Sequence, residues 1–385
     1  QETLMEETIV LGLDRVQLVY EKLFPNGLPY TVITVAGTNG KGSTVSFIDS
    51  IYRQSTYKVG RSTSPHLLKY NERYAIDGED VSDEVIINAF ELIETKREDI
   101  KLTYFEFSTL AAFIIFEKAE VDIAILEVGL GGRLDSVNVV DSDVSIITNI
   151  AIDHTDYLGD TREAIGREKA GVMRGSRPCI CGDQDPPQSL LAYAKEIGTD
   201  ITFVRKAYED DIGLEGDHQR LNAAVAIQAV ESLKEQHPIS FSMIIEGVKS
   251  ATIKARFEKI EIGEKTIILD VAHNPAAVKT LVDTLSKSSM QTVAIFSALI
   301  DKDIIEMVDL ASNAIKHWYL VPLTAERAIE SDALKNKFSN PDSTTICKDM
   351  NSAIQESLAY KEAERIVIFG SFYTIADASI IINEL

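Results

Sequence analysis

Short runs of apolar, mostly β-branched residues alternate along the chain with stretches whose apolar positions recur at helical spacing. The runs at 31–36, 121–128 and 144–150 have the length of buried strands. Helical spacing covers residues 43–53, 83–95, 107–119, 161–172 and 220–233. Strands that alternate with helices predict an α/β fold, in which helices cover a mostly parallel sheet.

The alternation pauses between about residues 250 and 264 and then starts again. A strand at 266–271 precedes a helix from Pro275, and further strands are expected near 293–296, 318–321, 343–347 and 366–369. This second series, roughly 120 residues long, has the size of a separate Rossmann-like domain. We therefore predict an N-terminal domain at 1–252 and a smaller Rossmann-like C-terminal domain at 257–385, with the boundary near 251–257.

The chain of 385 residues carries 38 Lys and Arg against 60 Asp and Glu, a net charge of −22. Nucleic-acid backbones are bound by dense positive charge, so this balance argues against a nucleic-acid partner. The three cysteines fit free thiols in a reducing cytosol. The acidic start, Gln1-Glu2-Thr3, is no apolar signal stretch, and no apolar run approaches the roughly eighteen residues of a membrane span. We expect a cytoplasmic protein without a membrane partner.

Residues 35–44, with the sequence VAGTNGKGST, follow a predicted strand and open a predicted helix. Glycines let the backbone approach an anion, and a helix N-terminus offers free N–H groups and a positive dipole end. Lys41 can reach the outer phosphates of a nucleotide, and the Ser43 hydroxyl can bind Mg²⁺. The candidate ATP-binding residues are Gly37, Thr38, Asn39, Gly40, Lys41, Gly42, Ser43 and Thr44. They predict a P-loop-type ATPase domain, although Gly42 separates the lysine from the serine. The alternative is a glycine-rich turn that binds nothing.

Other polar groups follow the expected strands. Glu127 lies at the end of the strand 121–128, and Asp153-His154 comes after the strand 144–150. The carboxyl ends of parallel strands face the crevice in which ligands bind. Lys169 lies on a predicted helix, and periodicity alone leaves a solvated helix face open as its position. The turn Ser64-Pro65-His66 indicates no function by itself.

These motifs occur in an order that resembles one family. The phosphate loop is followed by motifs at 63–67 (TSPHL), 71–73 (NER), 103–106 (TYFE), 126–135 (LEVGLGGRLD), 153–159 (DHTDYLG), 168–171 (EKAG), 256–258 (RFE) and 270–275 (DVAHNP). The series runs from about residue 11 to residue 376. It closely resembles folylpolyglutamate synthases of the Mur ligase superfamily, in particular the bacterial branch that is also a dihydrofolate synthase.

The resemblance implies ATP-dependent formation of an amide. ATP phosphorylates a substrate carboxylate, the amine of L-glutamate attacks the acyl phosphate, and phosphate leaves. The implied substrates are dihydropteroate, reduced folates and L-glutamate. The implied cofactors are ATP and Mg²⁺ at two sites, with K⁺ as a further candidate, and the implied state is a monomer. Metal ions and Lys41 would neutralise charge on the transferred phosphoryl group.

The resemblance also assigns roles to single residues. One Mg²⁺ would be held by Ser43 and Glu127, and a second by Ser64 and His154. Lys169 matches a lysine that is carbamylated in several relatives, where it lies near the metal. The implied nucleotide and phosphate contacts outside the loop are Asn222, Arg256, Asp270 and His273, and the implied catalytic residues are Lys41, Lys169, Asp270 and His273.

The pterin pocket of the family maps to several separate segments. Its residues here are Leu11, Gly12, Ser64, His66, Arg73, Thr103, Tyr104, Phe105, Glu106, Leu134, Asp135 and Ser136. Phe105 can stack on the pterin ring or be an ordinary core aromatic, and Arg73 can meet the substrate carboxylate. Ser136 stands where bacterial relatives commonly carry alanine.

Two other functions stay open at this point. A different Mur-type ligase would join an amino acid to a cell-wall precursor, but the motif Tyr104-Phe105-Glu106 and the glycine-rich segment 129–133 argue against it. A nucleotide-dependent switch would bind ATP without ligation. The full set of candidate catalytic and metal-binding side chains argues for catalysis instead.

Overall fold

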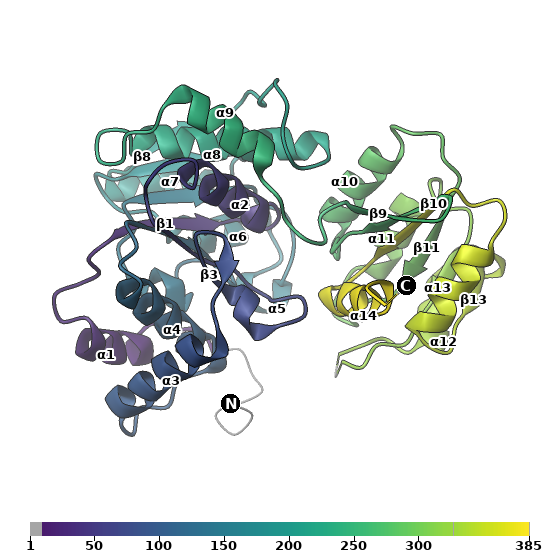
Figure 1. Ribbon diagram of the computed structural model, residues 1–385, viewed down its shortest axis with the longest axis horizontal. Coiled ribbons are helices and arrows are strands. Elements are labelled where there is room, and N and C mark those ends of the chain that lie inside the picture. Colours follow the sequence, from purple (N-terminus) through teal and green to yellow (C-terminus); the bar gives the residue numbers. More distant parts are fainter. Residues whose placement is uncertain (1–9, 326, 385) are drawn as a thin grey trace. The chain divides into compact units, whose positions relative to one another are not determined.

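The computed structural model describes residues 10–325 and 327–384. The acidic start, Gln1-Glu2-Thr3, lies outside the described residues. The described chain divides into two compact units, which are coloured by sequence in Figure 1. One contains the chain up to Gly213 together with Gln219–Thr252, and the other contains Leu214–His218 together with the chain from Ile253. Among the described helices, none combines the length and the apolar character that a bilayer crossing demands.

The first unit is built on a sheet of eight strands in the order β4-β3-β2-β5-β1-β6-β7-β8. The strands are β1 (Thr31–Ala36), β2 (Val59–Ser62), β3 (Tyr74–Ile76), β4 (Glu79–Asp80), β5 (Ile123–Glu127), β6 (Val144–Ile147), β7 (Pro178–Cys181) and β8 (Asp200–Phe203). Neighbouring pairs from β2 to β8 along this order are parallel, and β3 pairs antiparallel with β2 and β4. The mostly parallel sheet confirms the predicted fold class, and the strands expected at 31–36, 121–128 and 144–150 are β1, β5 and β6.

Helices cover this sheet. They are α1 (Asp14–Leu23), α2 (Lys41–Tyr52), α3 (Asp83–Arg97), α4 (Tyr104–Lys118), α5 (Thr155–Leu158), α6 (Arg162–Ala170), α7 (Gln188–Ile197), α8 (Asp217–Ser232) and α9 (Phe241–Ser250), with 3₁₀ helices η1 (Tyr70–Arg73) and η2 (Ser136–Val139). Helix α2 packs on β1, β2 and β5 and is covered by α9. Every residue of α2 after Lys41 is therefore buried, which holds the helix behind the phosphate loop firmly in place.

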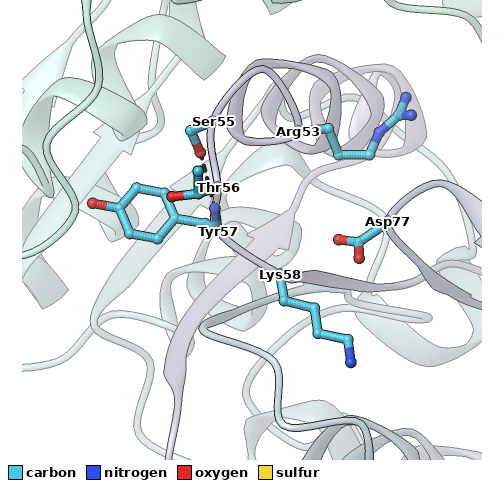
Figure 2. Close-up of a pocket in the computed structure, with 6 residues that line it drawn as sticks. All are labelled: Arg53, Ser55, Thr56, Tyr57, Lys58 and Asp77. Atoms are coloured by element: carbon cyan, nitrogen blue, oxygen red, sulfur yellow. Dashed lines mark hydrogen bonds between the residues drawn. The ribbon is translucent and has the colours of Figure 1, made fainter.

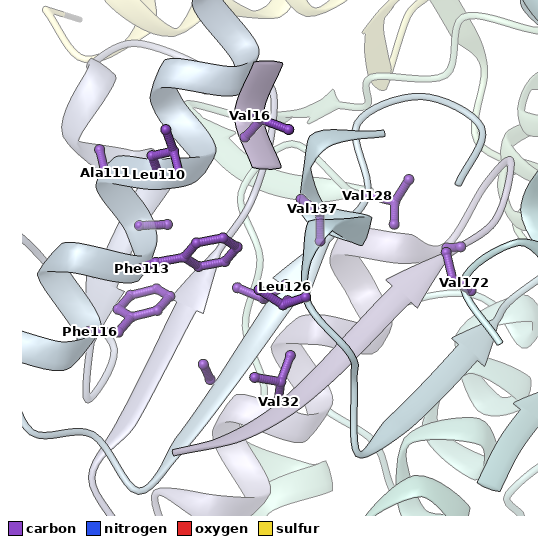
Figure 3. Packing of buried hydrophobic residues seen from close by; sticks show 14 of the residues in the cluster. Val16, Val32, Leu110, Ala111, Phe113, Phe116, Leu126, Val128, Val137 and Val172 are labelled. Carbon is purple, nitrogen blue, oxygen red and sulfur yellow. The ribbon is translucent and has the colours of Figure 1, made fainter. Parts of the chain in front are cut away.

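The opposite face of the sheet carries a large apolar core. Leu110 and Phe113 of α4 pack with Val32 of β1 and Leu126 of β5 (Figure 3). Ile33, the next residue after Val32, is also fully buried, because successive side chains of a strand point to opposite faces and α2 covers the other one. A large apolar side chain contributes about 1.5–3 kcal/mol when it is fully buried. Burial on both faces fixes the register of β1 and β5, and with it the position of the groups at their carboxyl ends.

Helix α4 begins earlier than the helix expected at 107–119. Thr103 is its N-cap: the Thr103 hydroxyl accepts a hydrogen bond from the N–H of Glu106, whose carboxylate accepts one from the N–H of Thr103. This reciprocal pair is a capping box. The Thr-x-x-Glu spacing is a start signal that apolar periodicity alone does not detect.

The second unit contains a six-stranded sheet in the order β13-β12-β11-β14-β10-β9. Its strands are β9 (Glu258–Ile262), β10 (Lys265–Leu269), β11 (Thr292–Phe296), β12 (Trp318–Leu320), β13 (Thr344–Ile346) and β14 (Arg365–Phe369). Its helices are α10 (Pro275–Leu285), α11 (Ile304–Ala311), α12 (Ser331–Lys335), α13 (Met350–Ala359) and α14 (Phe372–Ile382), with the 3₁₀ helix η3 (Pro341–Ser343). All neighbouring pairs except β9–β10 are parallel, as expected for a Rossmann-like domain.

Strand β9 corrects the expected pause between residues 250 and 264. It is an antiparallel edge strand whose residues alternate between half-buried and exposed. Its exposed positions are the charged residues Lys259 and Glu261, and charged side chains on an edge strand hinder pairing with other chains. A pattern search for buried strands misses such an element because only one of its faces is covered.

The segment Leu214–His218 belongs to the second unit although it precedes the expected boundary. Lys259 Nζ pairs with Glu215 Oε1 at 2.5 Å, and Lys287 Nζ pairs with Asp217 Oδ1 at 2.5 Å. Surface ion pairs of this kind contribute little energy each. Apolar periodicity carries no signal for so short a segment, so a single boundary was expected from the sequence.

Candidate active site

Four adjacent parallel strands, β2, β5, β1 and β6, bring their carboxyl ends to one edge of the first sheet. The chain after β1 is the phosphate loop, and the turn with Ser64 follows β2. Glu127 is the last residue of β5 and lies opposite Val35 of β1, while His154 follows β6. The strand order thus gathers candidate groups from four separate segments at one edge, which is where open α/β sheets bind ligands.

The phosphate loop adopts a conformation that depends on glycine. Gly37 has φ 148° and Gly40 has φ 83°. A Cβ on Gly37 would lie 1.8 Å from Oγ1 of Thr148, so no larger residue fits there. Lys41 is the first residue of α2, and its Nζ donates hydrogen bonds to the carbonyls of Gly37 at 3.2 Å and Thr38 at 3.4 Å. The ammonium group is therefore held over the loop.

Two residues after β6 anchor this loop, and the sequence analysis missed both. Thr148 Oγ1 donates to the carbonyl of Asn39 at 2.6 Å, and Asn149 Oδ1 accepts from the N–H of Asn39 at 2.8 Å. The hydroxyl of Thr38 adds a bond to the carbonyl of Ala151 at 3.1 Å. The available signal was the run of polar residues directly after a buried strand, Thr148-Asn149, at the same sheet edge as the loop.

Ser43 and Thr44 are buried in the first turn of α2. Among the described residues, none makes a hydrogen bond with the Thr44 hydroxyl. Asn222 of α8 lies against the loop, since a Cβ on Gly40 would come within 2.7 Å of its Oδ1, and its amide donates to Gln219 Oε1 at 2.9 Å. Helix α8 thus places Asn222, an expected nucleotide contact, beside the phosphate loop.

Glu127 and Ser64 lie together, as the strand order requires. Glu127 is only 7% exposed, and its Oε2 accepts a hydrogen bond from the N–H of Ser64 at 3.2 Å. A buried carboxylate supplies hard oxygen donors, which suit Mg²⁺ together with nucleotide phosphates. In the part of the chain that the structure describes, no three His, Cys, Asp or Glu side chains form a metal-binding group.

His154 is less enclosed than Glu127. It is the N-cap of α5 with φ 52°, an uncommon conformation for a residue other than glycine. Its side chain is 39% exposed, and its Nε2 lies 4.0 Å from Asp153 Oδ2. The imidazole of His154 is thus partly exposed to solvent at this edge of the sheet, next to the mostly buried carboxylate of Asp153.

Lys169 is buried, so the alternative of a solvated helix face is wrong. Only 3% of the residue is exposed. Burial, followed by the nearby ammonium of Lys41, lowers the pKa of Lys169 to about 7, although the carboxylates of Asp153 and Asp135 act in the opposite direction. Burial also raises the pKa of Asp135 to about 6, against the hydrogen bonds that its carboxylate accepts. Lys41, Lys169, Asp135 and Asp153 are therefore electrostatic neighbours.

The segment 129–133 packs tightly between Phe105 and α6. A Cβ on Gly129 would lie 2.5 Å from the Phe105 ring, and a Cβ on Gly132 would lie 2.9 Å from the carbonyl of Glu168. Arg133 donates to Glu168 Oε1 through Nε at 3.1 Å and Nη2 at 2.8 Å. These contacts position Lys169, the residue after Glu168.

Arg73 lies in a cage of aromatic rings beside the Ser64 turn. Its guanidinium carbon is 5.4 Å from the ring centre of Tyr70 and 5.2 Å from that of Tyr104, and the residue is 7% exposed. Arg73 Nε donates to Nδ1 of His66 at 2.9 Å. Burial and Arg73 hold the pKa of His66 below its usual range. His66 therefore accepts at Nδ1 and carries its proton on Nε2.

Several of the expected pterin-pocket residues also have structural contacts. Glu106 caps α4 and pairs with Arg15 at 3.0 Å, and the N–H of Gly12 donates to the carbonyl of Leu134 at 3.3 Å. The hydroxyl of Ser136 is 2.6 Å from that of Thr109. These contacts bring residues 12, 106, 134 and 136 into one region of the first unit.

The second unit holds the remaining candidates. Asp270 accepts from the N–H groups of Phe257 and Ala272, both at 2.8 Å. Burial raises the pKa of Asp270, and Arg256 and these hydrogen bonds act against the rise. His273 Nδ1 lies 2.8 Å from the carbonyl of Val271. Asp270 thus fixes the backbone at Phe257 and at Ala272, next to the carboxyl end of β10.

Two family models match the chain. Residues 35–195 match the Mur ligase middle domain, and residues 255–372 match the Mur ligase glutamate ligase domain. The dihydrofolate synthase/folylpolyglutamate synthase of Escherichia coli is 35% identical, covering 99% of this chain and 94% of the relative. The chain belongs to this family of Mur ligases. The folylpolyglutamate synthase of Lacticaseibacillus casei is 33% identical over 76% of each chain.

Solved structures of the family share the fold. E. coli FolC in complex with DHPP and ADP matches with a TM-score of 0.93 and 35% identity, over 100% of this chain and 96% of that chain. A bifunctional folylpolyglutamate synthase/dihydrofolate synthase with Mn, AMPPNP and L-glutamate bound matches with a TM-score of 0.90 and 37% identity, over 98% of this chain and 96% of that chain. Family members of this fold thus bind a nucleotide and a divalent metal.

Two of the hollows in the part of the chain that the structure describes lie on the first unit, and the phosphate loop lines neither of these two. One of about 420 Å³ is lined by Arg53, Ser55, Thr56, Tyr57, Lys58 and Asp77 (Figure 2). It lies where α2 ends and β2 begins, at the edge of the sheet opposite the candidate site. The other, of about 550 Å³, is lined by Lys69, Tyr70, Asn71, Asp80, Val81, Ser82 and Asp83.

Proposed function

We propose that this protein joins L-glutamate to 7,8-dihydropteroate, and to the glutamate tail of reduced folates, at the expense of ATP. The observation that carries the proposal is the convergence of the phosphate loop, Glu127, Ser64 and buried Lys169 at one sheet edge, in a chain of this ligase family. A carboxylate is a poor electrophile, so its oxygen first takes the γ-phosphoryl group of ATP. The amine of L-glutamate then attacks the acyl carbon, and inorganic phosphate leaves.

The residues of the loop have defined tasks in this reaction. Its glycines and the N-terminus of α2 present N–H groups to the phosphates, and Lys41 neutralises charge on the transferred phosphoryl group. Ser43 and Glu127 would hold one Mg²⁺, with Ser64 and His154 near a second, and bound Mg²⁺ supplies charge neutralisation and alignment of the phosphates. Asn222, Arg256, Asp270 and His273 are assigned to the nucleotide and the phosphate. K⁺ binding and a monomeric state belong to the same proposal.

Lys169 is proposed to act as a carbamate. Its Nζ attacks CO₂, a bond forms between nitrogen and carbon, and one proton is released. The reaction needs a neutral amine, and a pKa of about 7 supplies one near neutral pH. The product is an anion close to the proposed metal sites, where a carboxylate-like group is stabilised and an ammonium is not.

One phosphoryl-transfer centre would serve both substrates. The terminal carboxylate of each must reach the γ-phosphate, so a substrate with a longer tail must hold its pterin farther out. Phe105, beside Gly129, is proposed to contact the pterin of dihydropteroate, with Arg73 near the substrate carboxylate. The pterin of a reduced folate then leaves this position.

A phosphate-release assay tests the proposal. The purified protein is given ATP, Mg²⁺ and L-glutamate with dihydropteroate, and separately with tetrahydrofolate. We expect phosphate release that depends on glutamate with both acceptors. Phosphate release without either acceptor, or none that depends on glutamate, would instead support a nucleotide-dependent switch.

A further inference from the structure

We infer that Arg162 and Asp183 are positioning residues of the phosphoryl-transfer site, which act by holding the chain after β6 in place against the phosphate loop. This inference rests on the proposed function, and it adds two residues that the sequence analysis did not single out. Arg162 is the first residue of α6, and Asp183 follows β7. The two side chains thus reach the same loop from different elements.

Both backbone polar groups of Ile150 are held by this pair. The N–H of Ile150 donates to Oδ2 of Asp183 at 2.6 Å, and its carbonyl accepts from Nε of Arg162 at 3.0 Å. Nη2 of Arg162 also donates to Oδ1 of Asp183 at 3.1 Å, which closes the arrangement. Ile150 lies between β6 and α5, where no helix or strand fixes the backbone. Arg162 and Asp183 therefore form a clamp on Ile150.

The next residue, Ala151, is bound to the phosphate loop. The Thr38 hydroxyl accepts from the N–H of Ala151 at 3.0 Å and donates to its carbonyl at 3.1 Å. Two adjacent residues are thus held from two sides, one by the clamp and one by the loop. His154, a proposed metal ligand, follows three residues after Ala151. A shift of Ile150 would therefore displace both Thr38 and His154.

Helix α6 connects the clamp to Lys169. Lys169 comes about two turns after Arg162 on this helix, which places both side chains on the same helix face. The start of α6 is itself tied to α7, because the carboxylate of Glu163 accepts from the N–H groups of Gln188 at 3.0 Å and Ser189 at 2.7 Å. Arg162 therefore reaches Ile150 from a fixed support.

Stability is a weak reason to bury the carboxylate of Asp183, which is only 5% exposed. Removing a charge from water costs free energy that an ion pair offsets only in part, so apolar residues often stabilise a core equally well. The pair instead supplies a fixed geometry. A displacement of about 1 Å in an active site can lower the rate about a hundredfold. The proposed reaction depends on alignment of this kind.

A similar pair at the other end of β6 provides a matched control. Oδ2 of Asp143 accepts from the N–H of Val32 at 2.9 Å, and its Oδ1 accepts from Nη1 of Arg177 at 3.0 Å. Arg177 Nη1 also donates to the carbonyl of Ser142 at 2.8 Å. This pair thus holds backbone groups as the clamp does, but it lies directly before β6, whereas the phosphate loop contacts the chain after β6.

Two substitutions remove the clamp while they preserve size. Arg162→Lys keeps the positive charge but has a single nitrogen, which cannot reproduce the fork that contacts Ile150 and Asp183 together. Asp183→Asn keeps the shape. Its amide NH₂ would face a backbone N–H on either side, since Oδ2 accepts from Ile150 and Oδ1 from Asp185 at 2.9 Å. The controls are Arg177→Lys and Asp143→Asn.

Three quantities are measured for each protein. They are the Kd of AMPPNP with Mg²⁺ by calorimetry, kcat and KM for dihydropteroate in the ligation assay, and the free energy of unfolding in urea. We expect both clamp variants to raise the Kd of AMPPNP about tenfold and to lower kcat about tenfold or more. The KM for dihydropteroate should stay at the wild-type level, because the proposed acceptor contacts lie on other elements.

The control variants separate positioning from general stability. They should keep the wild-type Kd and kcat even where urea unfolding shows lower stability. Wild-type Kd and kcat in folded Arg162→Lys protein, or equal losses in Arg177→Lys, would overturn the inference; Arg162, with 37% of its side chain exposed, is the change that leaves the core intact. Failure of the proposed function is separate, because the wild-type protein would then not ligate, while the AMPPNP titration still compares the variants.

Discussion

Lys41 and Lys169 show how the fold changes the chemistry of single residues. Two backbone carbonyls hold Lys41 over the phosphate loop. Burial and the positive charge of Lys41 lower the pKa of Lys169. The role of Lys41 was readable from sequence, because its neighbours form a recognisable loop after a strand. The burial of Lys169 was not, because its partners lie on other segments and helical periodicity leaves its face undetermined.

Lys41→Ala should abolish ligation without unfolding the protein. The lysine is half-buried at the first position of α2 and lies outside the core. Removal of one group that stabilises transition-state charge costs about a hundredfold or more in kcat. The measurement is glutamate-dependent phosphate release, with circular dichroism as the check on folding. The control is Lys58→Ala. Lys58 is an exposed lysine directly before β2, at the edge of the sheet opposite the phosphate loop. Near-normal turnover of folded Lys41→Ala protein would contradict the phosphate-loop assignment.

Lys169 should take up CO₂ as the pH rises through about 7. Above its pKa the amine is neutral and can attack, whereas an ordinary lysine, with a pKa of 10.5, stays protonated until far higher pH. With ¹³C-labelled bicarbonate at constant dissolved CO₂, the ¹³C NMR signal of a carbamate should grow between pH 6 and pH 8. Lys169→Gln should lack that signal. An equal signal in Lys169→Gln would place the carbamate elsewhere.

At the scale of elements, buried strands and helices could be predicted from the sequence, whereas an edge strand and a long-range hydrogen bond could not. β1 and β5 are nearly all apolar, because both of their faces are covered, and this is visible in the sequence. β9 was missed because it is an edge strand with only one covered face. The anchor from Thr148 to Asn39 joins residues far apart in the chain, which no local pattern reveals.

The capping box of α4 gives Thr103 a role that is independent of any pterin contact. Thr103→Ala removes the hydroxyl that accepts from Glu106 and should lower the free energy of unfolding by about 1 kcal/mol. Thr103→Ser keeps that hydroxyl and should retain most of the stability. Urea unfolding of the three proteins measures the difference. Equal stabilities of the alanine and serine variants would show that the cap contributes nothing.

At the scale of the whole molecule, the sequence predicted two α/β domains but not the segment Leu214–His218, which belongs to the second unit. The sequence shows which motifs are present. The order of the strands in the sheet determines which of these motifs lie close together. The site could be assembled only because β2, β5, β1 and β6 are neighbours in the sheet. One phosphate loop then implies one centre for both proposed reactions.

Phe105→Ala should separate these reactions. The ring lies against Gly129 at the proposed seat for dihydropteroate, and the longer substrate places its pterin elsewhere. The kcat/KM for dihydropteroate should fall at least about tenfold more than that for tetrahydrofolate, since the ring would lose stacking and apolar contact with one substrate only. Equal losses for both acceptors would show that the two substrates share one pterin seat.

Transfer of oxygen from the acceptor to phosphate tests the central claim most directly. Dihydropteroate labelled with ¹⁸O in its carboxylate is incubated with the protein, ATP, Mg²⁺ and L-glutamate, and the released phosphate is examined by mass spectrometry. Activation as an acyl phosphate predicts that each phosphate carries one ¹⁸O, because the carboxylate oxygen that takes the phosphoryl group leaves with it. Unlabelled phosphate accompanying amide formation would contradict the proposed reaction.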